Sequence, residues 1–298
     1  MSISVKNISK KYKTVLALQN ITFEVQEGEL FGLIGPDGAG KTTLFRLLTT
    51  LLIPNEGSAT VANYDIVKQV KEIRNSVGYM PGKFSLYQDL TIAENLAFFA
   101  TIFGTTIEEN YDLIEDIYVQ IEPFKNRRAG ALSGGMKQKL ALCCALIHKP
   151  KVLFLDEPTT GVDPVSRKEF WEMLKRLKQK GITILVSTPY MDEASLCDRI
   201  ALIQKGKILK IDSPDAIVKA YEKTIYEVAT NQMHNLILDL KEFPSQYSVF
   251  AFGEFMHYID KNDTFETETI RAYLHKKGHQ NISIQKATPT IEDVFMDL

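Results

Sequence analysis

The sequence has little cysteine. Its 298 residues include three Cys, of which Cys143 and Cys144 are adjacent in an apolar run and Cys197 stands alone. This number and spacing exclude a disulfide framework. A reducing, cytosolic compartment is therefore expected, with Cys143 and Cys144 as core residues.

The sequence also lacks long hydrophobic runs. A membrane-spanning helix needs about 20 mostly apolar residues, and the apolar stretches near 44–53 and 140–147 are shorter or interrupted by charge. The first residues lack the apolar stretch of a signal peptide. Any role at a membrane is thus expected to come through a partner protein.

No charge of one sign dominates. Lys and Arg total 35 and Asp and Glu total 37, a formal net charge of −2. The absent basic excess argues against nucleic acid or anionic lipid as a partner. With 45% hydrophobic and 24% charged residues, the composition excludes a disordered or low-complexity chain. The length allows one large domain or two.

Hydrophobic patterns predict an α/β domain. Short apolar runs at 151–155 and 182–187 are typical of buried parallel strands. An amphipathic helix over 167–180 separates them, and strand, helix, strand in this order predicts a βαβ sheet. Residues 3–25 and 58–67 are predicted to form further strands.

The pattern changes near 214–224. Beyond it, four short strand-like segments separated by helical ones predict a small α+β unit of about 75 residues. We therefore expect a domain over 1–220, with a helical subdomain at about 89–150, and a second domain over 221–298.

The strongest motif is a glycine-rich segment at 35–42 that matches G-x-x-x-x-G-K-[ST]. It follows an apolar run and precedes a predicted buried helix over 43–52, the context that makes the match meaningful. Glycines let the backbone wrap around phosphates, and amide groups at the helix start supply positive potential. Lys41 is predicted to reach the β- and γ-phosphates, and Thr42 to bind Mg²⁺. The alternative is a strand–helix turn that binds nothing. The candidate phosphate-binding residues are Gly35, Pro36, Asp37, Gly38, Ala39, Gly40, Lys41, Thr42 and Thr43.

A second motif ends the apolar run at 151–155 with Asp156 and Glu157. Asp156 is a candidate Mg²⁺ ligand, through water, and Glu157 is placed to orient or deprotonate an attacking water. Taken alone, such a pair is more often an exposed turn. The phosphate-binding motif elsewhere in the chain favours the metal interpretation.

A third motif is Leu-Ser-Gly-Gly-Met at 132–136. Ser133, Gly134 and Gly135 at a helix start offer a hydroxyl and unhindered N–H groups to a phosphate. The alternative role of Ser133 is a plain helix cap.

Together these motifs resemble the ATP-binding cassette (ABC) ATPases over about residues 1–220. The family's Walker A motif corresponds to 35–42, its signature to 132–136, its Walker B motif to 152–156 and its D-loop to 161–164. Tyr12 stands where the family keeps an aromatic that stacks on adenine, although ordinary strand packing would also explain it.

The resemblance implies a P-loop cassette with a mixed, mainly parallel core sheet, an antiparallel β subdomain and a helical subdomain. It implies ATP and Mg²⁺ as ligands, and a head-to-tail dimer with a second ABC cassette, identical or different. It also implies a separate transmembrane transporter subunit, with this chain on the cytoplasmic face of the cell membrane. Residues 83–87, rich in Phe, Leu and Tyr, are expected near the groove that receives that subunit, although simple packing under the helical subdomain would also explain them.

Residues 225–298, ending in Thr-Pro-Thr-Ile-Glu-Asp-Val-Phe at 288–295, are similar to the C-terminal extension of daunorubicin-resistance-type exporter cassettes. This resemblance implies multidrug export. The extension's role is open between a stabilising cap and a regulatory domain.

Two positions depart from the family. Gly82 replaces the usual Gln of the Q-loop, and Pro189 replaces the switch His. Pro has neither a polar side chain nor a backbone N–H. We expect a site that binds ATP but hydrolyses it slowly, either in an asymmetric heterodimer or in a homodimer with two slow sites. The alternatives to an exporter ATPase are a non-hydrolysing ATP sensor or assembly subunit, and a soluble ABC protein that acts on nucleic acid or ribosomes.

Overall fold

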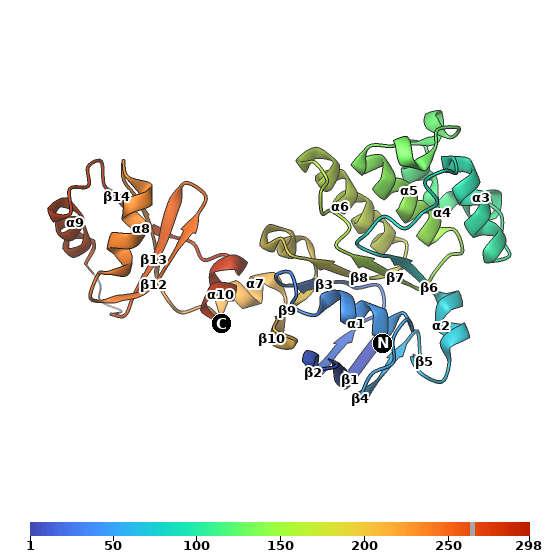
Figure 1. Cartoon of the computed structure of the whole chain (residues 1–298), viewed down its shortest axis with the longest axis horizontal. Helices are drawn as coiled ribbons and strands as arrows, with labels where there is room; N and C mark the ends of the chain where they lie inside the picture. Colours follow the sequence, from blue (N-terminus) through green and yellow to red (C-terminus); the bar gives the residue numbers. More distant parts are fainter. Residues whose placement is uncertain (263–265) are drawn as a thin grey trace. The chain divides into compact units, whose positions relative to one another are not determined.

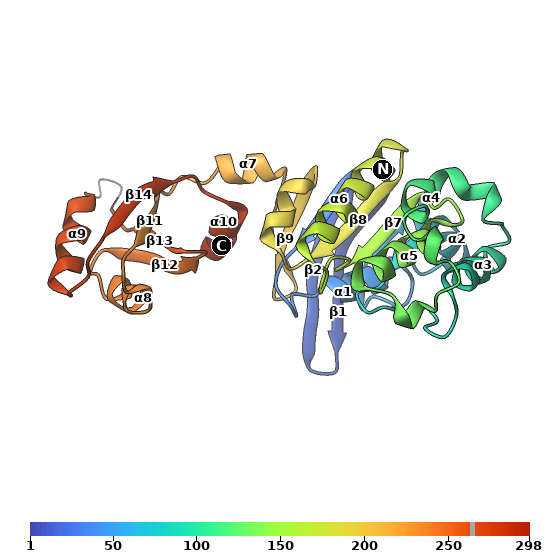
Figure 2. The ribbon, with the colours of Figure 1, turned by 90° about the horizontal axis from the view of Figure 1, so that it is seen from above.

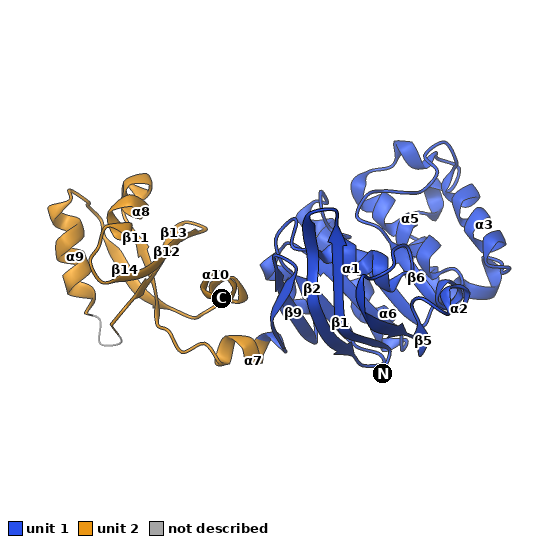
Figure 3. Ribbon diagram, turned by 60° about the horizontal axis from the view of Figure 1, so that its bottom comes forward, with its two compact units in different colours: residues 1–214 blue, residues 215–298 orange. Residues whose placement is uncertain are grey.

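The computed structural model describes residues 1–262 and 266–298. They form two compact units, Met1–Pro214 and Asp215–Leu298, which Figure 3 shows in different colours. In the part of the chain that the structure describes, no helix is both long and apolar enough to span a membrane.

A six-stranded sheet forms the centre of the first unit, in the order β10-β9-β3-β8-β7-β6 (Figure 1). The strands are β3 (Leu30–Ile34), β6 (Val77–Met80), β7 (Val152–Asp156), β8 (Thr183–Thr188), β9 (Arg199–Gln204) and β10 (Lys207–Asp212). All neighbours are parallel except β9 and β10. Every residue of β3, β7 and β8 is buried, as expected for parallel strands covered on both faces. The predicted α/β class is confirmed.

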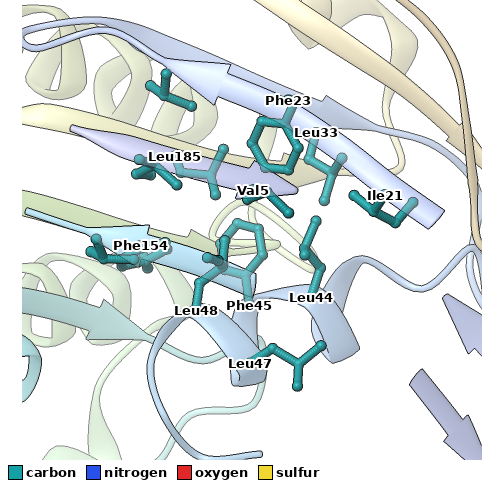
Figure 4. Packing of buried hydrophobic residues seen from close by; sticks show 14 of the residues in the cluster. Val5, Ile21, Phe23, Leu33, Leu44, Phe45, Leu47, Leu48, Phe154 and Leu185 are labelled. Carbon is teal, nitrogen blue, oxygen red and sulfur yellow. The ribbon is translucent and has the colours of Figure 1, made fainter. Parts of the chain in front are cut away.

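A smaller antiparallel sheet has the order β2-β1-β4-β5. Its strands are β1 (Ile3–Tyr12), β2 (Val15–Val25), β4 (Glu56–Val61) and β5 (Tyr64–Asp65). Helix α1 (Lys41–Leu48) packs between the two sheets, and Figure 4 shows Leu44, Phe45 and Leu48 pointing toward Val5 and Leu33. Burial of each such side chain contributes about 1.5–3 kcal/mol, so this core fixes α1 against both sheets.

The helix predicted over 43–52 is shorter at its end. It stops at Leu48, because Thr50 has a left-handed backbone with φ 62°. Arg74 binds Thr50 in this conformation, with Nε donating to the hydroxyl at 3.0 Å and Nη2 to the carbonyl at 3.2 Å. A long-range contact therefore ends the helix.

Helices fill the chain between β6 and β7, as predicted. They are α3 (Ile92–Ile102), α4 (Tyr111–Tyr118) and α5 (Gly134–Leu146), with short 3₁₀ turns η1 (Glu108–Asn110), η2 (Glu122–Phe124) and η3 (Ala129–Ala131). Thr91 and Glu94 form a capping box at the start of α3. Cys143 and Cys144 are buried in α5, and burial raises the pKa of both thiols.

Three more segments complete the first unit. They are α2 (Val70–Ser76), α6 (Pro164–Gln179) and η4 (Met191–Leu196). Asp163 caps α6, accepting a hydrogen bond of 3.0 Å from the Ser166 N–H. Gly181 then leaves the helix with φ 88°, a conformation that favours glycine.

The second unit begins in α7 (Pro214–Lys219) and has a βαββαβ core (Figure 2). Its elements are β11 (Ile225–Ala229), α8 (Met233–Lys241), β12 (Gln246–Phe252), β13 (Phe255–Asp260), α9 (Thr267–Lys276), β14 (Ser283–Ala287) and α10 (Ile291–Asp297). The sheet order is β12-β13-β11-β14, and all pairs are antiparallel. This is a split βαβ topology, the α+β unit that the sequence predicts.

The last helix of this unit is fastened by Asp293. One oxygen of its carboxylate completes a capping box with Thr290 at 2.7 Å, and the other lies 2.5 Å from Nδ1 of buried His257 on β13. Within the segment 288–295, Thr290 and Asp293 thus start α10 and attach it to the sheet.

Candidate nucleotide-binding site

The glycine-rich segment forms the turn between β3 and α1, at the carboxyl edge of the parallel sheet. Gly38 and Gly40 have φ angles of 77° and 107°. A Cβ on Gly40 would lie 2.7 Å from the Ala17 carbonyl oxygen, so only glycine fits there. The turn therefore follows the wall formed by β2 closely and directs the N-terminus of α1 toward open space.

A cavity of about 390 Å³ opens at this turn, a size typical of small-molecule sites. Four separate parts of the chain line it. The lining residues are Val15, Leu16, Ala17, Gly38, Ala39, Gly40, Lys41, Thr42, Thr43, Glu157, Lys205 and Gly206. The structure thus brings together seven of the predicted site residues, Gly38 through Thr43 and Glu157.

Lys41 is the buried charge of this cavity, with a side chain 3% exposed. Its Nζ donates to the carbonyls of Gly35 at 2.7 Å and Pro36 at 3.0 Å, and lies 3.1 Å from Oε1 of Glu157. A buried ammonium needs such partners. A polyphosphate could take the place of the carboxylate as the counter-charge.

Asp156 and Glu157 lie at the end of β7, beside Ser187 of β8. The Ser187 hydroxyl donates to Oδ1 of Asp156 at 2.7 Å. The Glu157 N–H donates to both the carbonyl and the hydroxyl oxygen of Ser187, at 3.1 Å each. Glu157 has φ 52°, a left-handed conformation that costs about 1–2 kcal/mol. Ser187 therefore holds a strained residue in place.

The Asp156 carboxylate affects the pKa of Tyr79 on the neighbouring strand β6. Burial and then the Asp156 carboxylate raise the pKa of Tyr79 to about 12, against an opposing effect of Arg46. Asp156 is itself 2% exposed. An anionic oxygen donor at this edge of the sheet suits a hard cation such as Mg²⁺.

Several predicted residues lie elsewhere. Gly35, Pro36 and Asp37 belong to the turn but do not line the cavity. Tyr12, 40% exposed, also lies outside its lining, and Lys10 Nζ is 5.7 Å from its ring. The apolar wall formed by β2 consists of Val15, Leu16 and Ala17 in this structure.

The Ser-Gly-Gly motif starts α5, away from this cavity's lining. The Ser133 hydroxyl accepts a hydrogen bond of 3.3 Å from the Met136 N–H and so caps the helix. A Cβ on Gly135 would lie 2.7 Å from the Ser166 hydroxyl of α6, which explains one of the two glycines by packing.

Sequence reasoning missed Lys205 and Gly206. They form the turn between β9 and β10, where the Gly206 N–H donates to the Ala39 carbonyl at 2.9 Å. The Gln19 N–H in turn donates to the Gly206 carbonyl at 2.8 Å. A Lys-Gly pair between two apolar runs signals the hairpin, but nothing local signals its contact with the phosphate-binding turn.

The two unusual positions lie at the same edge. A Cβ on Gly82 would be 3.0 Å from the Asp156 carbonyl oxygen and 3.8 Å from Cβ of Glu157. Pro189 directly follows Thr188, the last residue of β8. A side chain at position 82 would thus lie near the acidic end of β7. A side chain at position 189 would lie at the end of the adjacent strand, β8.

This fold and this site define a P-loop nucleotide-binding cassette. The model of the ABC transporter family matches residues 18–160. The chain is 32% identical to the Nod factor export ATP-binding protein I of a Rhizobium species. The match covers 100% of this chain and 97% of that protein. The chain belongs to the ABC transporter family, among its ATP-binding proteins.

Other relatives support the same assignment. The chain is 40% identical over 278 residues to the "Probable multidrug ABC transporter ATP-binding protein YbhF" of Escherichia coli, covering 92% of this chain. It spans only 47% of that relative's length.

Solved structures agree with the fold. An ATP-binding subunit of an ABC transporter is 28% identical, with a TM-score of 0.67 over 74% of this chain and 92% of that one. A dimeric post-hydrolysis state of the cassette MJ0796, bound to ADP and Pi, is 26% identical, with a TM-score of 0.64 over 71% of this chain and 98% of that one. The predicted cassette fold is confirmed.

Proposed function

We propose that this chain is the ATP-binding subunit of an ABC exporter, which energises transport through a separate membrane subunit by binding and hydrolysing ATP. The observation that carries the proposal is the ion pair between buried Lys41 of the phosphate-binding turn and Glu157, which follows Asp156 at the end of β7. The names of the relatives, a multidrug transporter protein and a Nod factor export protein, support export.

The residues of the cavity divide the work. Amides of the 35–42 turn and the start of α1 would hold the phosphates. Lys41 would exchange the Glu157 carboxylate for phosphate oxygens. This exchange would free Glu157 to accept a proton from the attacking water. Val15 and Leu16 would pack against the base, with Tyr12 closing over it.

Mg²⁺ fits the donors present. The Thr42 hydroxyl and the Asp156 carboxylate, directly or through water, are hard oxygen ligands, and Mg²⁺ usually takes few protein ligands beside phosphates and water. When bound, the cation neutralises charge on the β- and γ-phosphates.

The proposed working unit contains a second cassette. Ser133, Gly134 and Gly135 do not line this chain's own cavity, so we assign them to the γ-phosphate of a partner's ATP in a head-to-tail dimer. The dimeric MJ0796 cassette supports such an assembly. The partner is either a second copy or a different cassette, and the proposal involves no nucleic acid.

The membrane subunit would dock at a second cavity, of about 480 Å³, beside the loop that follows β6. Leu86 of that loop, Phe99 and Ile102 of α3, and Arg74 of α2 line it. Its apolar lining with one cation suits a short amphipathic helix. Docking there would place the chain on the cytoplasmic face of the cell membrane.

Hydrolysis at this chain's own site is proposed to be slow. Gly82 and Pro189 supply no polar side chain beside Asp156 or the end of β8 to position water or the γ-phosphate. Loss of one such group commonly costs about 10²–10³ in rate. The same observation favours a second candidate, a non-hydrolysing ATP sensor. We also propose that the cassette covers residues 1–220 and that residues 221–298 form an accessory domain; the division of the chain into compact units after Pro214 supports this.

The test is ATP binding by the purified chain and by Lys41→Ala, together with co-expression of candidate membrane subunits. We expect micromolar binding that Lys41→Ala weakens at least about ten-fold, since a charged partner of the phosphates is lost. Co-purification with a hydrophobic subunit separates a transporter from a soluble ABC protein. Equal binding by both proteins would contradict the proposed site.

A further inference from the structure

Glu193 is a buried carboxylate that the proposed mechanism leaves unused. It lies in η4, and its side chain is 2% exposed. Oε1 accepts from the Thr159 hydroxyl at 2.8 Å and from Nε and Nη2 of Arg167 at 3.1 and 2.9 Å. Oε2 accepts from the Thr188 hydroxyl at 2.5 Å. Four hydrogen bonds satisfy this charge inside the protein.

The three residues that bind Glu193 come from three different segments of the chain. Thr159 lies two residues after Glu157, Thr188 ends β8 immediately before Pro189, and Arg167 belongs to α6. A single carboxylate therefore ties the segment after β7 to the segment after β8 and to a helix. A buried polar network whose groups are all hydrogen-bonded favours one arrangement of its members.

The segment after β8 is held on both sides. The Thr188 hydroxyl, which donates to Glu193, also accepts from the Tyr190 N–H at 3.1 Å. The Arg167 guanidinium lies 4.2 Å from the centre of the Tyr190 ring. Pro189, between these contacts, has a fixed φ. These contacts hold the turn at the position where the family has its switch His.

The segment after β7 is held in the same way. Ser187 fixes the backbone of Glu157 from its N–H side. On the other side, the Thr160 N–H donates to the Glu157 carbonyl at 3.2 Å, and Glu193 anchors Thr159. The left-handed conformation of Glu157 persists only if its surroundings enforce it.

We infer that Glu193 is a positioning residue: through the Thr159 hydroxyl it sets the backbone of Glu157, and through Thr188 and Arg167 it locks the segment that contains Pro189. This inference rests on the proposed ATPase function. The Thr159 hydroxyl is the link to test, because its removal leaves Glu193 paired with Arg167.

The experiment compares Thr159→Val, which keeps shape and loses the hydroxyl, with Thr159→Ser, which keeps the hydroxyl. Slow turnover is measured by release of radiolabelled phosphate. We expect Thr159→Val to lower kcat about ten-fold through misplacement of Glu157, with KM and ATP affinity unchanged. Thr159→Ser retains most of the wild-type kcat.

Asp192→Ala is the matched control. Asp192 also pairs with Arg167, at 3.3 Å, but its side chain is 75% exposed. Exposed pairs contribute little, so we expect wild-type kcat, KM and melting temperature.

Hydrogen exchange of the amides of 157–162, read without nucleotide, tests the link apart from catalysis. Thr159→Val should exchange faster than Thr159→Ser. Equal exchange and equal kcat in the two variants would overturn the inference. Failure of the wild-type chain to bind ATP would instead overturn the proposed function, while the exchange data would still decide the positioning role.

Discussion

Replacement of Gly206 by Ala should disturb the nucleotide site, because Gly206 lines its cavity and contacts the phosphate-binding turn. Gly206 has φ 75°, which costs a non-glycine residue about 1–2 kcal/mol. In addition, the new Cβ would lie 2.6 Å from the Ala17 carbonyl oxygen, and such overpacking costs about 1–3 kcal/mol. The expected total destabilisation is about 2–5 kcal/mol.

Gly181→Ala separates the two contributions. Gly181 also has a left-handed backbone, with φ 88°, but a Cβ there would meet none of the described residues beyond its chain neighbours within 4 Å. This variant should lose only the conformational part, about 1–2 kcal/mol. At about 2–4 °C per kcal/mol for a domain of this size, thermal unfolding should distinguish the two variants.

Nucleotide binding provides the second measurement. The Gly206 N–H donates to Ala39 of the phosphate-binding turn, so relief of the clash must move that turn. We expect about ten-fold weaker ATP binding by calorimetry, or about 1.4 kcal/mol, for Gly206→Ala and no change for Gly181→Ala. Equal melting temperatures and equal ATP affinities of the two variants would refute a role of the Gly206 contact in shaping the phosphate-binding turn.

Two further predictions concern charged groups. Lys205→Ala should weaken ATP and ADP binding several-fold but leave adenosine binding unchanged, because an ammonium on the cavity wall attracts phosphate. The control is Lys207→Ala, an exposed lysine of the same hairpin outside the cavity lining. An equal loss of adenosine binding in Lys205→Ala would contradict a phosphate contact. Burial lowers the pKa of His148, which stacks on Phe103 at 3.8 Å. The folded state therefore prefers the neutral ring, and this stability is complete above the unfolded pKa of about 6.5 and lost as pH falls through the folded pKa. Between about pH 7.5 and 5.5 the melting temperature of wild type should fall more than that of His148→Gln, and equal falls would argue against His148.

The core of the fold could be predicted because its signals are local. Buried runs at 151–155 and 182–187, and a glycine-rich turn before a helix, each depend on a few adjacent residues. The packing of the β9–β10 hairpin on the turn could not be predicted, because it joins Gly206 to Ala39 and Gln19 across the chain. The place of Tyr12 relative to the cavity depends equally on tertiary packing.

Site residues that belong to a recognisable motif could be predicted from the sequence. Residues that only hold those site residues in place could not. Glu193 follows Asp192 in a short polar segment, a pattern typical of solvent-exposed turns. Only the fold surrounds one of these two carboxylates with Thr159, Arg167 and Thr188 and leaves the other exposed.

The measurement that tests the account most directly is steady-state ATP turnover by wild type and by the double variant Gly82→Gln, Pro189→His. Gly82→Ala is the control, since it adds the same Cβ near the Asp156 carbonyl without a polar group. We predict that wild type binds ATP but turns over well below about 1 s⁻¹, and that the double variant gains about ten-fold, or about 1.4 kcal/mol in barrier. Wild-type turnover of about 1 s⁻¹ or more, or an equal gain from Gly82→Ala, would contradict a site impaired by Gly82 and Pro189.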